Sequence, residues 1–174
     1  MIYEKSKSKS ITHNRADITK VVSETLNKMA AVVGATLGPG GRVVLIERDG
    51  LSPLVTKDGV TVAKSLGLDN AEANIIVDSA KEICLKTAKE AGDGTTTAIV
   101  LANSITKHGL EFLGKNPKYN PQRMISELND LYNDVIIPFL KKNAKDVKTK
   151  EELVNVAKIS ANGDEKIALA AVEA

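Results

Sequence analysis

The chain has 174 residues, of which 43% are hydrophobic and 26% charged, a composition that fits one globular domain and excludes a disordered polymer. The net charge of +2 is too small to argue for a nucleic-acid partner. No apolar run approaches the roughly 20 residues that cross a bilayer, so we expect no membrane partner either. The single cysteine, Cys84, excludes an intrachain disulfide and favours a reducing, cytoplasmic compartment.

Apolar spacing and turn residues predict mixed elements in the first half of the chain. Gly38 and Pro39 should end the first helix, with glycine supplying a left-handed cap and proline forbidding continuation. Asp49-Gly50 is a hairpin turn signal, and Pro53 restricts the return strand to an edge. The predicted elements are a flexible polar arm over residues 1–13, a helix from Asn14 to Leu37, strands over 42–48 and 51–56, and a short helix over 60–66.

The second half is predicted to be helical. Pro138 should kink or end the helix in which it lies, and Thr149 followed by Glu152 indicates a capping box. The predicted elements are a helix over 71–91, with Ile75, Ile76, Ala80, Ile83, Thr87 and Ala91 on or near one face, a helix after Gly94, a loop over 114–121, and helices containing Met124–Phe139, following Thr149 and following Asp164. The last helical pattern runs to Ala174 without a cap, so we expect a fragment or a chain that packs against something it does not contain.

The segment from Ala91 to Thr97 carries the most distinctive chemistry of the sequence. It places Asp93, two glycines and three consecutive threonines at the start of a helix, where backbone N–H groups lack intrahelical partners. A bare phosphate would be repelled by Asp93, so a phosphate site here requires a cation such as magnesium between them. The alternative is that Asp93 only caps the helix.

Two further turns have related chemistry. Thr36–Arg42 is a glycine-rich turn without the Gly-Lys-Ser/Thr of a Walker loop, and Thr56–Gly59 places Lys57 beside Asp58. Each turn alone is more typical of an ordinary turn between secondary-structure elements than of a binding site. Because all three lie at junctions between elements that could converge, they are candidates for one shared ligand.

These segments, together with Ile159-Ser160-Ala161-Asn162, resemble in sequence and order those of the group I chaperonins. The resemblance covers about Thr19 to Ala174. It implies a mainly α, equatorial-domain-like helical bundle with a small β-hairpin, here truncated. It further implies that residues 14–150 belong to the nucleotide-binding equatorial domain and that residues 151–174 begin an intermediate domain.

The resemblance also implies roles for individual residues. ATP would bind with Mg²⁺ and K⁺, and Asp93 would ligate the magnesium while Asp58 orients the attacking water. Lys57 would hold the phosphates together with the helix start. The implied nucleotide-binding residues are Thr36, Leu37, Gly38, Pro39, Lys57, Asp93, Gly94, Thr95, Thr96 and Thr97.

The sequence departs from the family pattern in ways that a divergent, for example virus-encoded, member would show. Gly40 stands where family members usually have lysine, residues 114–121 carry an insertion, and Pro138 interrupts a helix. The client-binding apical domain and the returning equatorial segment are not in the sequence. Contacts with unfolded clients would therefore need regions absent here, whereas ring partners and a co-chaperonin follow from the resemblance.

Two functional hypotheses remain open at this point. The chain is either the ATP-binding portion of a chaperonin subunit, with ATP hydrolysis coupled to protein folding in the complete subunit, or a stand-alone module without turnover. Such a module would bind nucleotide or pair with a full-length chaperonin. A reading frame that continues past Ala174 would favour the first hypothesis, and a stop codon there the second.

Overall fold

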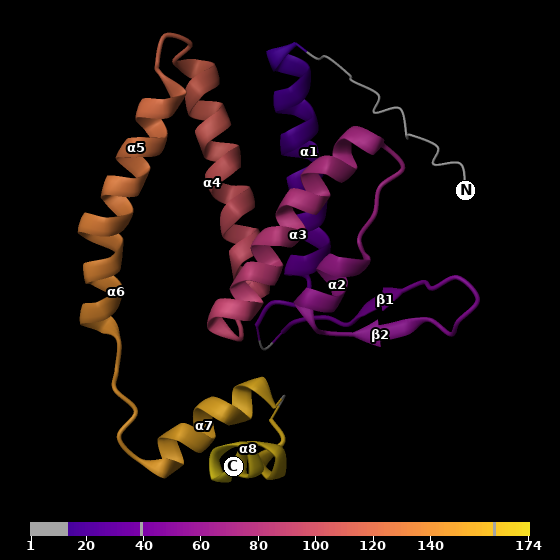
Figure 1. Cartoon of the computed structure of the whole chain (residues 1–174), viewed down its shortest axis with the longest axis vertical. Helices are drawn as coiled ribbons and strands as arrows, with labels where there is room; N and C mark the ends of the chain where they lie inside the picture. Colours follow the sequence, from indigo (N-terminus) through magenta and orange to yellow (C-terminus); the bar gives the residue numbers. More distant parts are fainter. Residues whose placement is uncertain (1–13, 39, 162) are drawn as a thin grey trace, which may run out of the picture. The chain divides into compact units, whose positions relative to one another are not determined.

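The computed structural model describes residues 14–38, 40–161 and 163–174. The predicted arm over 1–13, Pro39 and Asn162 lie outside the described residues. The chain is mainly α-helical with one small β-hairpin, as predicted, and its contacts divide it into two compact units, one ending at Lys115 and one spanning Asn116–Ala174 (Figure 1). No helix among the described residues combines the length and the apolar character that crossing a bilayer requires.

The first unit is a helical bundle with a two-stranded antiparallel sheet. Helix α1 packs against α3 and α4, and the short α2 contacts all three of these helices (Figure 1). The strands pair with Val44 opposite Thr56 and Ile46 opposite Leu54. The elements are α1 (Arg15–Gly34), β1 (Val44–Ile46), β2 (Leu54–Thr56), α2 (Gly59–Ser65), α3 (Ala71–Ala91) and α4 (Thr95–Lys115).

Helix α1 begins where the sequence predicted but ends earlier. The Asn14 side chain accepts a hydrogen bond from the Asp17 N–H and caps the helix. The prediction that Gly38 caps the other end was wrong, since α1 already ends at Gly34. The N–H of Thr36 donates to the Val33 carbonyl three residues back, which tightens the last turn, and Gly38 bends the chain only afterwards with φ +73°.

The core of the first unit consists of aliphatic and small side chains, as the composition required. Its fully buried large residues are Met29, Ile99, Val33, Val62, Val77 and Cys84. Burial raises the pKa of the Cys84 thiol, which behaves as a small buried hydrophobe.

The inward face of α3 agrees only in part with the predicted one. Ile75 is 66% exposed and Ile83 is 41% exposed, although periodicity placed both on the core face. Ala80 is buried as predicted and Ile76 packs against the core, while α3 also buries Ala73, Val77 and Cys84. Small side chains suit the space that is left beside Met29 and Ile99.

The second unit contains a helix that passes through a proline. Helix α5 (Pro121–Leu131) continues into a π-helical turn, η1 (Tyr132–Ile136), and then into α6 (Ile137–Asn143). Pro138 has no N–H for the usual bond four residues back, and the chain adapts with the wider π turn, in which the Ile137 N–H donates to the Tyr132 carbonyl. Pro138 therefore changes the helix locally and does not end it.

Helices α7 (Lys150–Ser160) and α8 (Glu165–Glu173) pack against each other in the second unit. The predicted capping box at the start of α7 is present. The backbone N–H groups of Lys148 and Thr149 donate to the Glu152 carboxylate and hold its pKa below the ordinary value. Asp164 caps α8, as predicted.

Candidate functional site

Three turns of the first unit meet at Thr96, the second residue of α4. In the turn after α1, the Oγ1 of Thr36 lies 3.3 Å from the Oγ1 of Thr96. Gly59, the first residue of α2, approaches so closely that a Cβ atom there would lie 2.2 Å from the same Thr96 oxygen. The structure thus brings together the three turns that sequence chemistry singled out.

The turn after α1 folds back tightly on itself. A Cβ atom at Gly41 would lie 2.3 Å from the Thr36 carbonyl oxygen, so this approach requires a residue without a side chain. Leu37 is 47% exposed and Gly38 is exposed as well. Both leave surface that a ligand could contact, whereas Pro39 lies outside the described residues.

The start of α2 is capped by Asp58. Its Oδ1 accepts from the Val60 N–H at 3.2 Å, and its Oδ2 accepts from the N–H and the hydroxyl of Thr61. Partial burial alone would raise the pKa of Asp58, but these hydrogen bonds, with a smaller contribution from Lys64, outweigh it and lower the pKa. The neighbouring Lys57 is exposed and has no ion-pair partner among the residues that the structure describes.

The start of α4 has an unusual backbone. Gly94 adopts φ +86°, which side chains disfavour, and the Oδ1 of Asp93 accepts from the Gly94 N–H at 2.6 Å. Since α4 begins at Thr95, Gly94 holds the N-cap position, so the structure does not favour the alternative that Asp93 is the cap. The first intrahelical bond runs from the Ala98 N–H to the Gly94 carbonyl, which leaves the N–H groups of Thr95–Thr97 without intrahelical acceptors.

The donors at this helix start match an anionic ligand. Free N–H groups and the helix dipole attract negative charge, and the hydroxyl of the exposed Thr97 adds a donor. Thr95 is only 5% exposed and offers a ligand the least surface of the three threonines. This arrangement can hold a phosphate group without a Walker lysine.

Asp93 is the carboxylate at this helix start that could ligate a divalent cation. Across residues 14–38, 40–161 and 163–174, no three His, Cys, Asp or Glu side chains gather into a metal cluster. Magnesium at nucleotide sites commonly uses one or two carboxylates and completes its shell with phosphate oxygens and water. The residues present therefore fit a magnesium ion that arrives with a phosphate chain.

The three turns were identified from the sequence, but the glycine that tightens one of them and the glycine that lets another approach Thr96 were not. Gly41 and Gly59 lie within the motifs, yet neither was a predicted site residue. The predicted helix began at residue 60, so the sequence did not place Gly59 inside a helix, where a glycine needs a reason because it weakens the helix.

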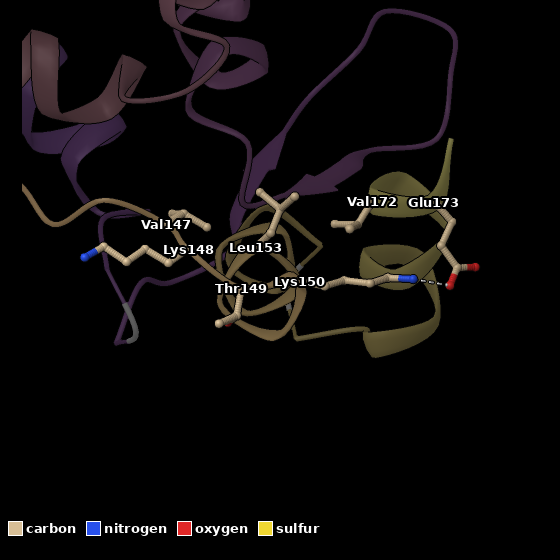
Figure 2. A pocket seen from close by; sticks show the side chains of 7 residues that line it. All are labelled: Val147, Lys148, Thr149, Lys150, Leu153, Val172 and Glu173. Atoms are coloured by element: carbon tan, nitrogen blue, oxygen red, sulfur yellow. Dashed lines mark hydrogen bonds and ion pairs between the residues drawn. The ribbon is translucent and has the colours of Figure 1, made fainter.

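An open depression is formed entirely by residues of the second unit. It lies between the start of α7 and the end of α8, where the Lys150 ammonium pairs with the Glu173 carboxylate at 2.9 Å (Figure 2). None of the predicted site residues lines it. Its lining residues are Val147, Lys148, Thr149, Lys150, Leu153, Val172 and Glu173.

Comparisons with known proteins point to one family. Residues 29–174 match the family model described as the TCP-1/cpn60 chaperonin family. Two crystal forms of the chaperonin gp146 from the bacteriophage EL 2 (Pseudomonas aeruginosa), both in the presence of ATP-BeFx, are 32% identical to the chain, with TM-scores of 0.72 and 0.73 over 90% and 92% of it. A group III chaperonin in the open state is 29% identical over 88% of the chain, with a TM-score of 0.68.

The chain spans less than a third of the length of these solved structures. It covers 27% and 28% of the phage protein and 30% of the group III protein. The matches therefore concern one portion of a longer architecture.

Proposed function

The chain belongs to the TCP-1/cpn60 chaperonin family, and we propose that it is the ATP-binding portion of a chaperonin subunit. When complete, such a subunit assists protein folding through ATP-driven conformational changes of a ring. The observation that carries the proposal is the meeting of three polar turns at Thr96, beside a helix start with free backbone N–H groups. The presence of ATP-BeFx with the similar phage chaperonin supports a nucleotide as the ligand.

The proposed roles are those that the resemblance to chaperonins implies, and the residue types in each turn suit them. The start of α4 binds phosphate oxygens, Lys57 offsets their charge, and Asp93 takes the magnesium, with potassium beside the phosphates. Residues 36–39 line the nucleotide pocket. The bound magnesium would supply charge neutralisation, while the chain's own residues orient the phosphates, which is most of what phosphoryl transfer requires.

Asp58 retains room for the role of orienting a water. A carboxylate has about four acceptor positions, and the cap uses three of them. The remaining position lies on Oδ1, which accepts only from the Val60 N–H among the described residues. The lowered pKa keeps Asp58 ionised at neutral pH, so its free acceptor position can take a hydrogen bond from an aligned water.

We propose that the whole protein hydrolyses ATP and assembles into a ring with other subunits. We also propose that it acts on unfolded clients, with a co-chaperonin as a further partner. We expect the isolated 174-residue chain to hydrolyse ATP barely or not at all, because a returning segment would complete the pocket. Turnover in the purified chain that Asp58→Ala abolishes would contradict this expectation. A cytoplasmic location fits the single, buried Cys84.

Calorimetry with the ATP analogue AMP-PNP, Mg²⁺ and K⁺ tests the proposal on the purified chain. We expect binding that Asp93→Ala removes and that Asp69→Ala leaves unchanged. Asp69 is a matched control because it precedes α3, whose 21 residues span about 30 Å before the Asp93 turn begins. A folded chain that fails to bind, or equal effects of the two substitutions, would contradict the proposal.

A further inference from the structure

Gly59 occupies a position that its backbone conformation does not explain. It is the first residue of α2 and is buried. Positive φ angles among the described glycines occur at Gly38, Gly50, Gly92, Gly94 and Gly163, and not at Gly59. Any residue could adopt the backbone there, and most would favour the helix more than glycine does. The missing side chain itself must therefore be the reason.

The space beside Gly59 is filled by the hydroxyl of Thr96. A Cβ atom at position 59 would lie 2.2 Å from the Thr96 Oγ1 but 3.4 Å from the Thr96 Cβ. The first distance is impossible and the second is close to ordinary contact. A side chain at this position would thus conflict with the orientation of one hydroxyl and not with the helix behind it.

The Thr96 hydroxyl donates its proton to the hydroxyl oxygen of Thr36, as the hydrogen bonds of Thr36 show. The Thr36 hydroxyl donates its single proton to the Val33 carbonyl at 2.7 Å. The 3.3 Å contact between Thr36 and Thr96 must then be donated by Thr96. The Thr96 oxygen therefore fills the space beside Gly59 while its proton is donated to Thr36.

We propose that Gly59 is a positioning residue of the nucleotide site, because its missing side chain keeps the Thr96 hydroxyl turned toward Thr36. With alanine at position 59, Thr96 must rotate about χ1 until its Cβ hydrogen faces the new methyl group. The hydroxyl then leaves Thr36 and the phosphate-binding start of α4 changes shape. This inference rests on the proposed function for its effect on nucleotide affinity.

A double-mutant cycle tests the proposal in the full 174-residue chain, with AMP-PNP, Mg²⁺ and K⁺ as the probe. Gly59→Ala should weaken binding about fivefold to tenfold, the size of one lost hydrogen bond. In a Thr96→Ala background the same substitution should cost less than about twofold, since no hydroxyl remains to clash. Gly67→Ala is the control, because a Cβ atom at Gly67 meets nothing within 4 Å.

Three results of the cycle would overturn the proposal. One is an unchanged affinity in Gly59→Ala, and another is an equal loss in both backgrounds. The third applies if Gly59→Ala alone fails to fold. Adding Thr96→Ala should then restore folding, and a double variant that still fails to fold would overturn the proposal.

The χ1 angle of Thr96, measured by NMR couplings without nucleotide, separates this inference from the proposed function. We expect one rotamer in the wild type and a different one in Gly59→Ala. If the wild type binds no nucleotide but this rotamer changes, the proposed function fails while the positioning of Thr96 by Gly59 stands. An unchanged rotamer overturns the inference whatever the nucleotide does.

Discussion

Removing the carboxylate of Asp58 should destabilise the first unit by about 1–2 kcal/mol. Replacing an N-cap by alanine typically costs about 1 kcal/mol, within a range of about 0.5–2. Asp58 accepts three hydrogen bonds, and α2 behind it buries Val62 and Ala63, so the loss should reach the core and exceed simple fraying. Since Asp58 is exposed, its charge adds little to this figure. Asp58→Asn keeps a capping oxygen and should cost less than about 0.5 kcal/mol.

The contribution of Asp58 should also depend on pH. Its pKa is lowered in the folded chain, so its stabilising effect is present above the ordinary carboxylate pKa of about 4 and is lost as the pH falls through the folded value. The difference in stability between the wild type and Asp58→Ala should therefore shrink on acidification. It should not change between pH 6 and pH 8.

Urea unfolding followed by far-UV circular dichroism measures these differences, with Asp69→Ala as the control. Equal free energies of unfolding for Asp58→Ala and Asp69→Ala would show that Asp58 does not stabilise α2. If Asp58→Asn were as unstable as Asp58→Ala, the loss would come from charge and not from capping.

Four further predictions follow from burial and charge. Met29→Ala should lower the free energy of unfolding by about 2–5 kcal/mol, whereas Leu45→Ala should change it by less than about 0.5 kcal/mol because Leu45 is 68% exposed. Equal losses for the two variants in urea unfolding would show that Met29 is not packed in the core. The Cys84 thiol should react with a thiol reagent at pH 8 only after denaturant is added, and rapid labelling of the native chain would show that it is not buried. Because the pKa of Glu152 is lowered, the protection of α7 amides against hydrogen exchange should fall as the pH drops below about 4.3. In Glu152→Gln this protection should not depend on pH, and the reverse pattern would exclude the capping box as the source of the protection. The isolated chain should self-associate, since large apolar side chains such as Phe139 (64% exposed) remain on its surface, and a sharp, reversible, monomeric unfolding transition would count against this.

Local signals in the sequence predicted the elements well where a cap defines them. Asn14, Thr149 and Asp164 start their helices as expected, because an N-cap depends on hydrogen bonds within one turn. The hairpin between β1 and β2 likewise forms around Asp49-Gly50, with Gly50 at φ +68°.

Features that depend on tertiary contacts were harder to predict. The buried face of α3 was predicted only in part. Ala80 lies on it as expected, but Ile75 and Ile83 are exposed although they are more apolar, because the available space suits small side chains. Pro138 was expected to kink or end its helix. The helix does not end there, because a π turn upstream absorbs the missing hydrogen bond.

The candidate site was predictable in its chemistry but not in its contacts. Three turns with polar and glycine residues were recognised as possible neighbours from their residue types alone. The approach of Gly59 to Thr96 joins residues far apart in the sequence, and no local pattern encodes it. The roles of individual residues toward a nucleotide remain a prediction.

An NMR titration of the purified chain with Mg²⁺ and AMP-PNP tests the central claim most directly, because it reports on each of the three turns separately. A nucleotide site shared by the three turns should make the amide signals of Thr36, Lys57 and Thr95–Thr97 shift together with one dissociation constant, while those of the second unit do not shift. Shifts confined to the second unit, or a folded chain whose three turns do not respond, would contradict such a shared site.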